Sequence, residues 1–390
     1  MSARLLLSCG EASGDLYAGA LTRQLRAIDP SVDVFGLGGP QMAGAGARLV
    51  VDYRGLAATG VTEVLPKLGE YFAAMRALVA AAERERPDAL VVIDFPDFNF
   101  RLARRVKRLG IPVVYYISPQ IWAWRRGRLK AIRAFADRVL VIFPFEEQIY
   151  RDAGVPVEFV GHPLIELTTV TAPRAEFLQS RGLRADAPTV AILPGSRANE
   201  VQRILPDLML AADRIRDAVP TAQFVLARAP HLDDAFFAHQ FSTGDGPGTD
   251  RVRPQVVEGD TDTVLASADV ALTASGTATI QAALHGTPMV VVYRMSPTTY
   301  HLARRLVRVP SIAMANLIAG EPIVPELVQD AFTPDAVARE AIAMLTDPAR
   351  AARIRDALAR VRERLGGAGA SRRAADAILR LVSERKPCPN

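Results

Sequence analysis

The sequence predicts an α/β protein of two domains, each built on a parallel β-sheet with helices on both faces. Three observations support this class. Short apolar runs rich in β-branched residues alternate with longer segments of helical periodicity, which is typical of parallel strands joined by helices. This rhythm stops in a polar stretch at 168–188 and then starts again. The 390 residues also exceed what one hydrophobic core usually supports.

The expected strands follow the chain in order. In the first domain they lie within 4–10, 32–39, 47–51, 88–94, 111–118, 138–143 and 157–161. In the second they lie within 189–196, 222–228, 255–259, 268–275 and 288–294, and the chain is helical from about 334 onward.

We place the domains at 1–170 and 187–365. The C-terminal helix, about 366–390, either caps the second domain or packs back on the first. The two domains are expected to be Rossmann-like lobes that face each other across a cleft. Ligands of such lobes bind beyond the carboxyl ends of the strands, so the strand-to-helix loops are the informative places.

The composition indicates a globular protein that meets anions. Hydrophobic residues make up 49% of the chain and charged residues 23%, which allows real cores. Two cysteines give no disulfide framework, and we find neither a signal peptide nor an apolar run of the ~18 residues that span a bilayer. We therefore expect a cytoplasmic protein with at most peripheral membrane contact. The net charge of +5 favours anionic partners, but the scattered basic residues argue against nucleic acid.

One loop of the second domain, "LPGSRANEV", is typical of an anion site. A strand turns there into a helix, whose free N–H groups and positive dipole can meet a phosphate beside Ser196. Arg197 adds a forked cation suited to phosphate. Glu200 either orients Arg197 or forms a capping box at the helix start.

A second loop, "ASGTATIQ", repeats this geometry. Ser275, Gly276 and Thr277 open a helix after a strand, and small residues with hydroxyls allow a diphosphate to sit on its N-terminus. Gln281, one turn further, either reaches a ribose hydroxyl or is an ordinary surface residue. Two such loops in one domain suggest a nucleoside diphosphate.

The first strand of the chain leads into "SCGEASGD". Its glycine spacing lacks the third glycine of a dinucleotide fingerprint, and the carboxylates of Glu11 and Asp15 would repel a pyrophosphate. Acids beside Ser13 and Gly14 suit sugar hydroxyls or proton transfer better. The alternative is a helix N-terminus that simply carries acidic residues.

Asp97 is the best candidate for a general base. It follows a buried strand in "VVIDFPDFNF" and stands among Phe95, Phe98 and Phe100, an apolar setting that suits proton transfer. The alternative is that Asp97 is the N-cap of the helix beginning near Phe98. The five histidines show no metal-ligand spacing, so no metal site is expected.

Seven segments together resemble one family. "GEASGD", "GLGGPQM", "IDFPDFNFRLA", "ISPQIWAWR", "LPGSRANEV", "ASGTATIQAAL" and "ANLIAG" stand in the order and context of lipid-A-disaccharide synthase. The resemblance covers nearly the whole chain, and "SPQIWAWR" is its most specific motif. It implies a glycosyltransferase fold of the B type, with the protein in the cytoplasm and peripheral on the inner face of the inner membrane.

The implied reaction is a glycosyl transfer with inversion. A 2,3-diacylglucosamine unit moves from its UDP derivative to 2,3-diacylglucosamine 1-phosphate (lipid X), which forms a β-1′,6 linkage and releases UDP. The resemblance implies no metal and no cofactor. Its expected partners are the two lipid substrates and the anionic membrane surface, and a homodimer is left open.

The resemblance also implies roles for residues. The proposed base is Asp97, and Glu11 belongs to the loop that faces the reacting sugars. Residues matching the donor site are Ser196, Arg197, Glu200, Ser275, Gly276, Thr277, Gln281 and Asn316. Residues on the acceptor side are Ser13, Gly14, Asp15, Trp124 and Arg125. Gln281 departs from the pattern, because relatives often have Glu there; an amide still hydrogen-bonds ribose hydroxyls, but a charged bidentate contact is lost.

The only two tryptophans, Trp122 and Trp124, stand together before a basic run. The basic residues that follow are Arg125, Arg126, Arg128 and Lys130. In a lipid-handling enzyme, such rings suit an apolar–polar boundary, and the cations suit phosphate groups of the acceptor or the bilayer. The alternative is that the rings pack under a helix and the arginines are solvated.

A second candidate membrane surface is the amphipathic stretch 59–81, for which ordinary core packing is the alternative. Its apolar residues are Val64, Leu65, Leu68, Tyr71, Phe72 and Met75. Two other functions remain open from the sequence: a UDP-N-acetylglucosamine 2-epimerase-like enzyme, and a UDP-sugar or lipid binding module without turnover.

Overall fold

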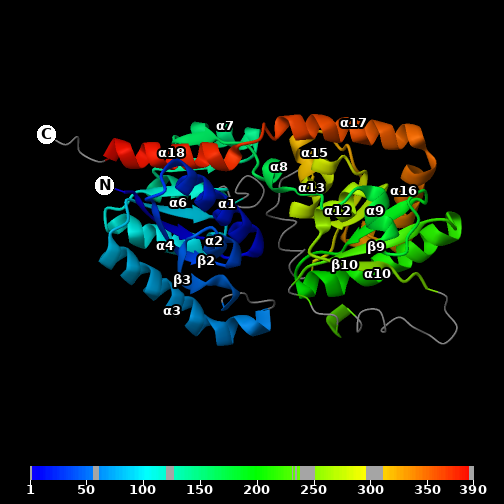
Figure 1. Ribbon diagram of the computed structural model, residues 1–390, viewed down its shortest axis with the longest axis horizontal. Helices are drawn as coiled ribbons and strands as arrows, with labels where there is room; N and C mark the ends of the chain where they lie inside the picture. Colours follow the sequence, from blue (N-terminus) through cyan, green and yellow to red (C-terminus); the bar gives the residue numbers. More distant parts are fainter. Residues whose placement is uncertain are drawn as a thin grey trace. The chain divides into compact units, whose positions relative to one another are not determined.

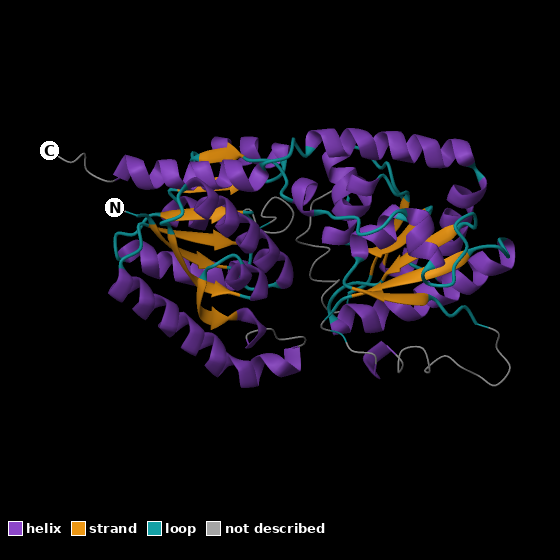
Figure 2. Cartoon of the chain, viewed as in Figure 1, coloured by secondary structure: helices purple, strands orange, loops and turns teal. Residues whose placement is uncertain are grey.

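The computed structural model describes residues 2–55, 61–119, 127–230, 232, 235–237, 251–295 and 311–385, with only the backbone of 61–68. The chain packs into two compact units. The first comprises Met1–Leu167 and Leu365–Asn390, and the second comprises Thr168–Arg364. Figure 2 shows that each unit has a layer of strands between helices.

The first unit contains a seven-stranded parallel sheet in the order β3-β2-β1-β4-β5-β6-β7. Its strands are β1 (Arg4–Ser8), β2 (Asp33–Gly38), β3 (Arg48–Asp52), β4 (Ala89–Ile93), β5 (Val113–Tyr116), β6 (Arg138–Val141) and β7 (Val157–Phe159). Its helices are α1 (Ala12–Ile28), α2 (Pro40–Gly44), α3 (Val61–Glu85), α4 (Pro96–Arg108), α6 (Gly127–Phe135), α7 (Pro144–Asp152), α8 (Leu164–Leu167) and α18 (Ala370–Arg385), with a 3₁₀ turn at Tyr53–Gly55.

The second unit contains a six-stranded parallel sheet in the order β10-β9-β8-β11-β12-β13. Its strands are β8 (Thr189–Leu193), β9 (Gln223–Arg228), β10 (Gln255–Glu258), β11 (Val270–Ala274), β12 (Met289–Tyr293) and β13 (Glu326–Val328). Its helices are α9 (Arg174–Gln179), α10 (Ala198–Ala218), α12 (Thr261–Ala266), α13 (Thr277–His285), α15 (Met314–Ala319), α16 (Pro334–Thr346) and α17 (Pro348–Arg364), with a 3₁₀ turn at Gln329–Ala331.

Helix α4 illustrates how the sequence pattern produces this packing. Phe98, Leu102 and Val106 recur every four residues and are fully buried in the core under the sheet. Arg104 and Arg108 fall on the opposite side of the helix and are exposed. The apolar stripe therefore fixes which face of α4 meets β4 and β5, and this sets the direction in which its first turn points.

Helix α18 belongs to the first unit although it ends the chain. It packs against α1, as Figure 1 shows. The carboxylate of Glu166 accepts hydrogen bonds from the backbone N–H groups of Gly369 (2.6 Å) and Ser371 (2.9 Å). A carboxylate at a helix N-terminus satisfies free N–H groups and the dipole together. Glu166 thus fixes the start of α18 to the segment from which the chain leaves this unit.

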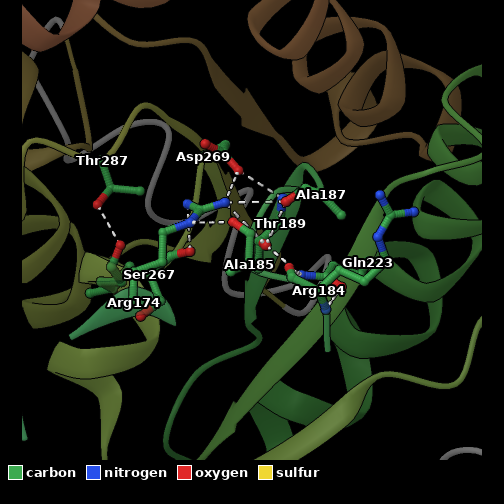
Figure 3. A network of polar contacts seen from close by, with 10 residues as sticks. Arg174, Arg184, Ala185, Ala187, Thr189, Gln223, Ser267, Asp269 and Thr287 are labelled. Carbon is green, nitrogen blue, oxygen red and sulfur yellow. Dashed lines mark hydrogen bonds and ion pairs between the residues drawn. The ribbon is translucent and has the colours of Figure 1, made fainter. Parts of the chain in front are cut away.

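A polar network at the amino ends of β8 and β11 ties the second sheet to the segment that precedes it (Figure 3). The guanidinium of Arg174 pairs with Asp269 (2.8 Å) and donates to the carbonyls of Ser267 (2.8 Å) and Ala187 (3.2 Å). Asp269 also accepts the backbone N–H of Thr189 at 2.8 Å. This network stabilises the edge of the sheet that is formed by the amino ends of its strands, away from the edge formed by their carboxyl ends.

The order of strands reverses between β1 and β4 in the first sheet and between β8 and β11 in the second. Loops at the carboxyl ends on either side of such a reversal run apart and leave a crevice for a ligand. All four loops of interest follow these strands: 9–15 follows β1, 94–97 follows β4, 194–200 follows β8, and 275–277 follows β11.

Candidate active site

The loop after β4 in the first unit is held in an unusual backbone conformation. Asp94 and Phe95 both have positive φ angles, 44° and 47°, which cost energy for residues with a side chain. The ring of Phe95 lies over Gly10, where a Cβ atom would come within 2.2 Å of the ring. Gly10 is therefore required for the β1 and β4 loops to approach each other this closely.

Asn99, fully buried in the first turns of α4, holds these two loops together. Its Nδ2 donates to the carbonyls of Ser8 (3.2 Å), Ile93 (3.2 Å) and Asp94 (2.8 Å), and its Oδ1 accepts the Ser8 hydroxyl at 2.6 Å. The side chain thus links the end of β1 to the end of β4. Because one of the acceptors is the carbonyl of Asp94, the side chain also stabilises the positive-φ pair that precedes α4.

Asp97 lies in the first turn of α4, and its side chain is 81% exposed. The expectation of an apolar setting is wrong, because Phe98 and Phe100 turn into the core while the carboxylate turns outward. The N-cap alternative is also wrong, since the N-cap residue is Phe95. The Asp97 carboxylate pairs with the Arg128 guanidinium at 2.6 Å, and its backbone carbonyl accepts the Tyr71 hydroxyl at 2.9 Å. A carboxylate in this position can reach a ligand without any movement of the fold.

The loop after β1 divides its residues between surface and interior. Glu11 is the N-cap residue of α1 and is exposed, and Ser13 is half-buried. Gly14 and Asp15 are buried. Glu11 and Ser13 therefore contribute accessible surface at the β1–β4 reversal.

Asp15 is a correction to the sequence analysis, which placed it on the acceptor side. Its carboxylate accepts the backbone N–H groups of Gly39 (2.8 Å), Gln41 (2.9 Å) and Met42 (3.1 Å). These are the otherwise unsatisfied donors at the start of α2, so the charge of Asp15 serves the fold. Its side chain is only 2% exposed, which leaves no face for a sugar hydroxyl.

The aromatic and basic residues placed on the acceptor side are only partly described. Trp122, Trp124 and Arg125 lie outside the described residues. Arg128, which follows them in α6, is the residue that pairs with Asp97. Its guanidinium also stands over the ring of Phe100, 5.4 Å from the ring centre. Sequence reasoning had noted Arg128 only as one of several cations.

In the second candidate membrane surface, the stretch 59–81, the side chains of Val64, Leu65 and Leu68 lie outside the described residues. Met75 is buried in the core, as the packing alternative expects, and Tyr71 is half-buried. Phe72 is exposed, with 47% of its surface accessible. Among the described residues of α3, Phe72 thus remains as an apolar side chain that another surface can contact.

The two anion loops of the second unit are neighbours, because β8 and β11 pair directly in the sheet. Arg197 is the N-cap residue of α10 and Gly276 that of α13, so both helices begin at this edge. Gly276 has φ +153°, and a Cβ atom there would meet nothing within 4 Å. Ser196 and Thr277 are exposed. Two helix N-termini with exposed hydroxyls and open space beside Gly276 form a suitable diphosphate site.

Glu200 orients Arg197. Its carboxylate pairs with the guanidinium at 3.0 Å and is 19% exposed, whereas Arg197 is 53% exposed. The carboxylate packs on Gly195, whose φ is +115° and where a Cβ would lie 3.0 Å from it. Burial raises the pKa of Tyr293, at the end of β12, and the negative charge of Glu200 adds to the rise. Tyr293 therefore belongs to this cluster, although no sequence motif indicated it.

Ser275 and Asn316 turn toward the protein. The Ser275 hydroxyl donates to the carbonyl of Ile312 at 3.1 Å. Asn316 is 2% exposed; its Nδ2 donates to Val324 and Glu326, and its Oδ1 accepts two backbone N–H groups, of Ile323 and Val324. All its hydrogen-bonding capacity is used by the turn before β13. The prediction that Asn316 contacts the donor is therefore corrected to a structural role.

Gln281 lies one turn into α13 and is half-buried. Its amide nitrogen donates to Oδ1 of Asp262 at 3.0 Å, and the same oxygen is 3.0 Å from the ring nitrogen Nε2 of His285. The other carboxylate oxygen of Asp262 accepts the backbone N–H of Thr169 at 3.2 Å. Asp262 therefore fixes the Gln281 side chain, and among the described residues no hydrogen bond to its acceptor oxygen Oε1 is found. Neither Asp262 nor His285 stood out in the sequence.

Two features are absent from the described residues, a membrane-spanning helix and a metal-binding cluster. None of the helices is both long enough and apolar enough to cross a bilayer. No three or more His, Cys, Asp or Glu side chains come together in a way that could hold a metal ion in the described part of the chain.

Comparison with known proteins identifies the family. A family model described as lipid-A-disaccharide synthetase matches residues 5–381. The chain belongs to the lipid-A-disaccharide synthetase family. Similar members are the synthases of Syntrophus aciditrophicus, 42% identical over 97% of this chain and 98% of that one, and Koribacter versatilis, 44% identical over 98% and 99%. The predicted family is therefore confirmed.

Solved structures confirm the fold class as well. The S. aureus MnaA–UDP co-structure has a TM-score of 0.68 at 12% identity and covers all of both chains. The calicheamicin glycosyltransferase CalG4 has a TM-score of 0.60 at 18% identity and covers 99% of this chain and 100% of its own. This family member thus shares the two-domain α/β fold of B-type glycosyltransferases and related epimerases. At such identities the likeness shows the fold alone, so the epimerase alternative has only distant support.

Proposed function

We propose that this chain joins two acylated glucosamine units. It transfers 2,3-diacylglucosamine from its UDP derivative to the 6-hydroxyl of 2,3-diacylglucosamine 1-phosphate and releases UDP. The observation that carries this proposal is the pair of helix N-termini at the β8–β11 reversal, in a chain that matches the family over nearly its whole length. One unit supplies the nucleotide site and the other the base.

The donor's diphosphate is bound by the two loops of the second unit. Backbone N–H groups at the starts of α10 and α13 and the hydroxyls of Ser196 and Thr277 hydrogen-bond the phosphate oxygens. Arg197, held by Glu200, meets the negative charge that grows on the β-phosphate as UDP leaves. Gln281 accepts a ribose hydroxyl through its free oxygen. This arrangement stabilises the leaving group with charges that are already in place.

Asp97 is the general base in this mechanism. It takes the proton of the acceptor's 6-hydroxyl as that oxygen bonds to the anomeric carbon of the donor. The bond from this carbon to UDP breaks, and its electron pair leaves on the β-phosphate. Attack opposite to the leaving group inverts the anomeric centre. Glu11 and Ser13, at the same reversal of the first sheet, hydrogen-bond sugar hydroxyls.

The substrates carry acyl chains, so we include the membrane in the proposal. Their headgroups lie at the inner face of the inner membrane, and the exposed Phe72 ring together with the basic outer face of α4 suits an anionic bilayer surface. A homodimer stays a prediction, which the mass of the protein in solution tests.

The test is the rate of disaccharide formation by Asp97→Asn, with chelator in a parallel assay. Removing a general base lowers kcat by about 10²–10⁴-fold. The thermal unfolding temperature should not move, because exposed ion pairs contribute little to stability. The matched control is Asp33→Asn, another exposed aspartate paired with an arginine (Arg4, 2.9 Å), at the opposite end of the same sheet. A folded Asp97→Asn enzyme with normal kcat would remove Asp97 from the mechanism. A wild-type protein that binds UDP but forms no disaccharide would favour the binding module.

A further inference from the structure

Arg128 is unusual among the cations around Asp97 because it is held on two sides. Its Nη2 pairs with the Asp97 carboxylate at 2.6 Å, and its guanidinium stands over the Phe100 ring at 5.4 Å. Only 22% of its side chain is exposed, against 81% for Asp97. An arginine stacked on a ring loses little further freedom when it binds an anion, so the site is organised in advance.

Within the part of the chain that the structure describes, most of the hydrogen-bonding capacity of Arg128 is unused. A guanidinium has five N–H donors. Within the described ranges, which omit 120–126, the bond from Nη2 to Asp97 is the hydrogen bond that Arg128 makes. The remaining donors can receive a second anion without breaking the pair with Asp97.

The surroundings of this pair carry excess positive charge. Arg101 lies one turn after Asp97 in α4, with its guanidinium 5.7 Å from the centre of the Tyr71 ring and 3.4 Å from the Tyr71 hydroxyl. Arg105 and Asp97 also act on Tyr71 electrostatically. Arg101 and Arg105 therefore add positive charge around Tyr71, whose hydroxyl bonds the Asp97 backbone carbonyl, and the local field favours an additional anion.

The acceptor sugar carries such an anion near its reacting group. Its phosphate is attached to C1. Its 6-hydroxyl is on C6, which is bonded to C5, and both C1 and C5 are bonded to the ring oxygen. The phosphate and the attacking hydroxyl thus leave the ring along the same edge. Asp97 can take the 6-hydroxyl, and Arg128, which is bonded to Asp97, can take the phosphate. The two side chains therefore match the two groups of the acceptor in charge and in closeness.

We propose that Arg128 binds the 1-phosphate of the acceptor and thereby makes the enzyme selective for phosphorylated acceptors. This inference rests on the proposed function, in which Asp97 acts on the 6-hydroxyl. Arg128 then does two things at once: one edge of its guanidinium orients the base, and the other edge binds the phosphate with charge-assisted hydrogen bonds. Arg101 adds charge to the same place.

The experiment compares two acceptors that differ only in the phosphate, 2,3-diacylglucosamine 1-phosphate and 2,3-diacylglucosamine. The enzymes are wild type, Arg128→Gln and Arg128→Lys, with Arg133→Gln as the matched control, since Arg133 is an exposed arginine of the same helix. A lost charge-assisted hydrogen bond corresponds to about a 10–100-fold fall in kcat/KM. We expect this fall for Arg128→Gln on the phosphorylated acceptor, a much smaller fall on the other acceptor, and partial recovery in Arg128→Lys.

Each other outcome overturns the inference. If Arg128→Gln loses the same factor on both acceptors, Arg128 only positions Asp97. If wild type uses both acceptors equally well, the enzyme has no phosphate site to assign. Titration calorimetry with glucosamine 1-phosphate gives a readout independent of turnover: weaker binding to Arg128→Gln than to Arg133→Gln is expected, and equal binding contradicts the site. Absence of disaccharide from wild type with either acceptor would instead refute the proposed function.

Discussion

Replacing Asn99 with alanine tests whether one buried amide holds the catalytic loop in shape. Asn99 is fully buried and makes four hydrogen bonds, to the Ser8 hydroxyl and to the carbonyls of Ser8, Ile93 and Asp94. Alanine removes all four and leaves their partners in the interior without a replacement. The comparison variant is Ser8→Ala, which removes only the 2.6 Å bond to Oδ1.

The magnitude follows from the number of bonds. A buried hydrogen bond contributes about 1 kcal/mol net, so Asn99→Ala should lower the free energy of unfolding by about 4 kcal/mol and Ser8→Ala by about 1 kcal/mol. In a unit of this size, 1 kcal/mol corresponds to about 2–4 °C in Tm. The first unit should therefore unfold about 8–16 °C lower in Asn99→Ala and about 2–4 °C lower in Ser8→Ala.

The assay is scanning calorimetry of wild type, both single variants and the double variant. The double variant should match the stability of Asn99→Ala to within a few tenths of a kcal/mol. The bond that Ser8→Ala removes is the one to Oδ1 of Asn99, which Asn99→Ala has already removed. Activity below the unfolding transition should also fall, since the Asp94–Phe95 pair loses the bond from Asn99 to its Asp94 carbonyl. Equal Tm values for Asn99→Ala and Ser8→Ala would refute the reasoning, because they would show that the three carbonyl bonds add nothing.

Three further predictions concern the second unit and pH. Gly276→Ala should weaken UDP binding at least about tenfold in titration calorimetry, because its Cβ would fill the open space beside the α13 N-terminus. Arg174→Met should lower the stability of the second unit by about 2–3 kcal/mol in urea unfolding without changing kcat, because it breaks the network of Figure 3. Burial lowers the pKa of His162 from 6.5 to about 3. The unfolded chain therefore binds a proton that the folded chain does not, and stability falls as the pH drops from 6.5 toward 3. Between pH 7 and pH 5.5 the loss should be about 1 kcal/mol, and it should vanish in His162→Gln.

Each of these has a control in the same chain. Gly182→Ala also places a side chain at a positive-φ site with open space, φ +71°, but away from the anion loops, so UDP binding should stay normal. Arg184→Met removes an exposed pair with Asp186 and should leave unfolding unchanged. Tight UDP binding by Gly276→Ala, equal effects of the two arginine variants, or an unchanged pH slope in His162→Gln would each contradict the corresponding argument.

The positions of most strands along the chain could be predicted from the sequence, because a parallel sheet that is buried on both faces leaves a local signal of apolar residues. All five residues of β4 and all five of β11 are buried; β4 is an unbroken apolar run, and in β11 only Thr273 is polar. Strand β13 was not predicted, since it has only three residues and follows Pro325. Its place in the sheet comes from pairing with β12, which no local pattern encodes.

The direction of a polar side chain was harder to predict. Asp15 and Asp97 both stand in the first turns of helices that follow neighbouring strands of one sheet, and both were assigned to substrates. Asp15 became buried because the start of α2 folds over it and offers three N–H groups. Asp97 stayed exposed because the apolar stripe of α4 turns its first-turn carboxylate outward. Both outcomes depend on tertiary packing, which residue spacing alone does not contain.

Burial therefore separates the polar residues at the two reversals into those that shape a loop and those that can meet a ligand. Asn99 and Asp15 in the first unit, and Asn316 in the second, use their polar atoms within the protein, mostly on backbone groups, and are at most 2% exposed. A buried amide or carboxylate can hold a loop only if it is fully satisfied there, which leaves it nothing to offer a substrate. Asp97 and Arg197 are exposed, and ion pairs with Arg128 and Glu200 respectively orient them while their side chains stay accessible. Substitutions of the first group should therefore change stability before activity, whereas substitutions of the second should change activity in a protein that remains folded.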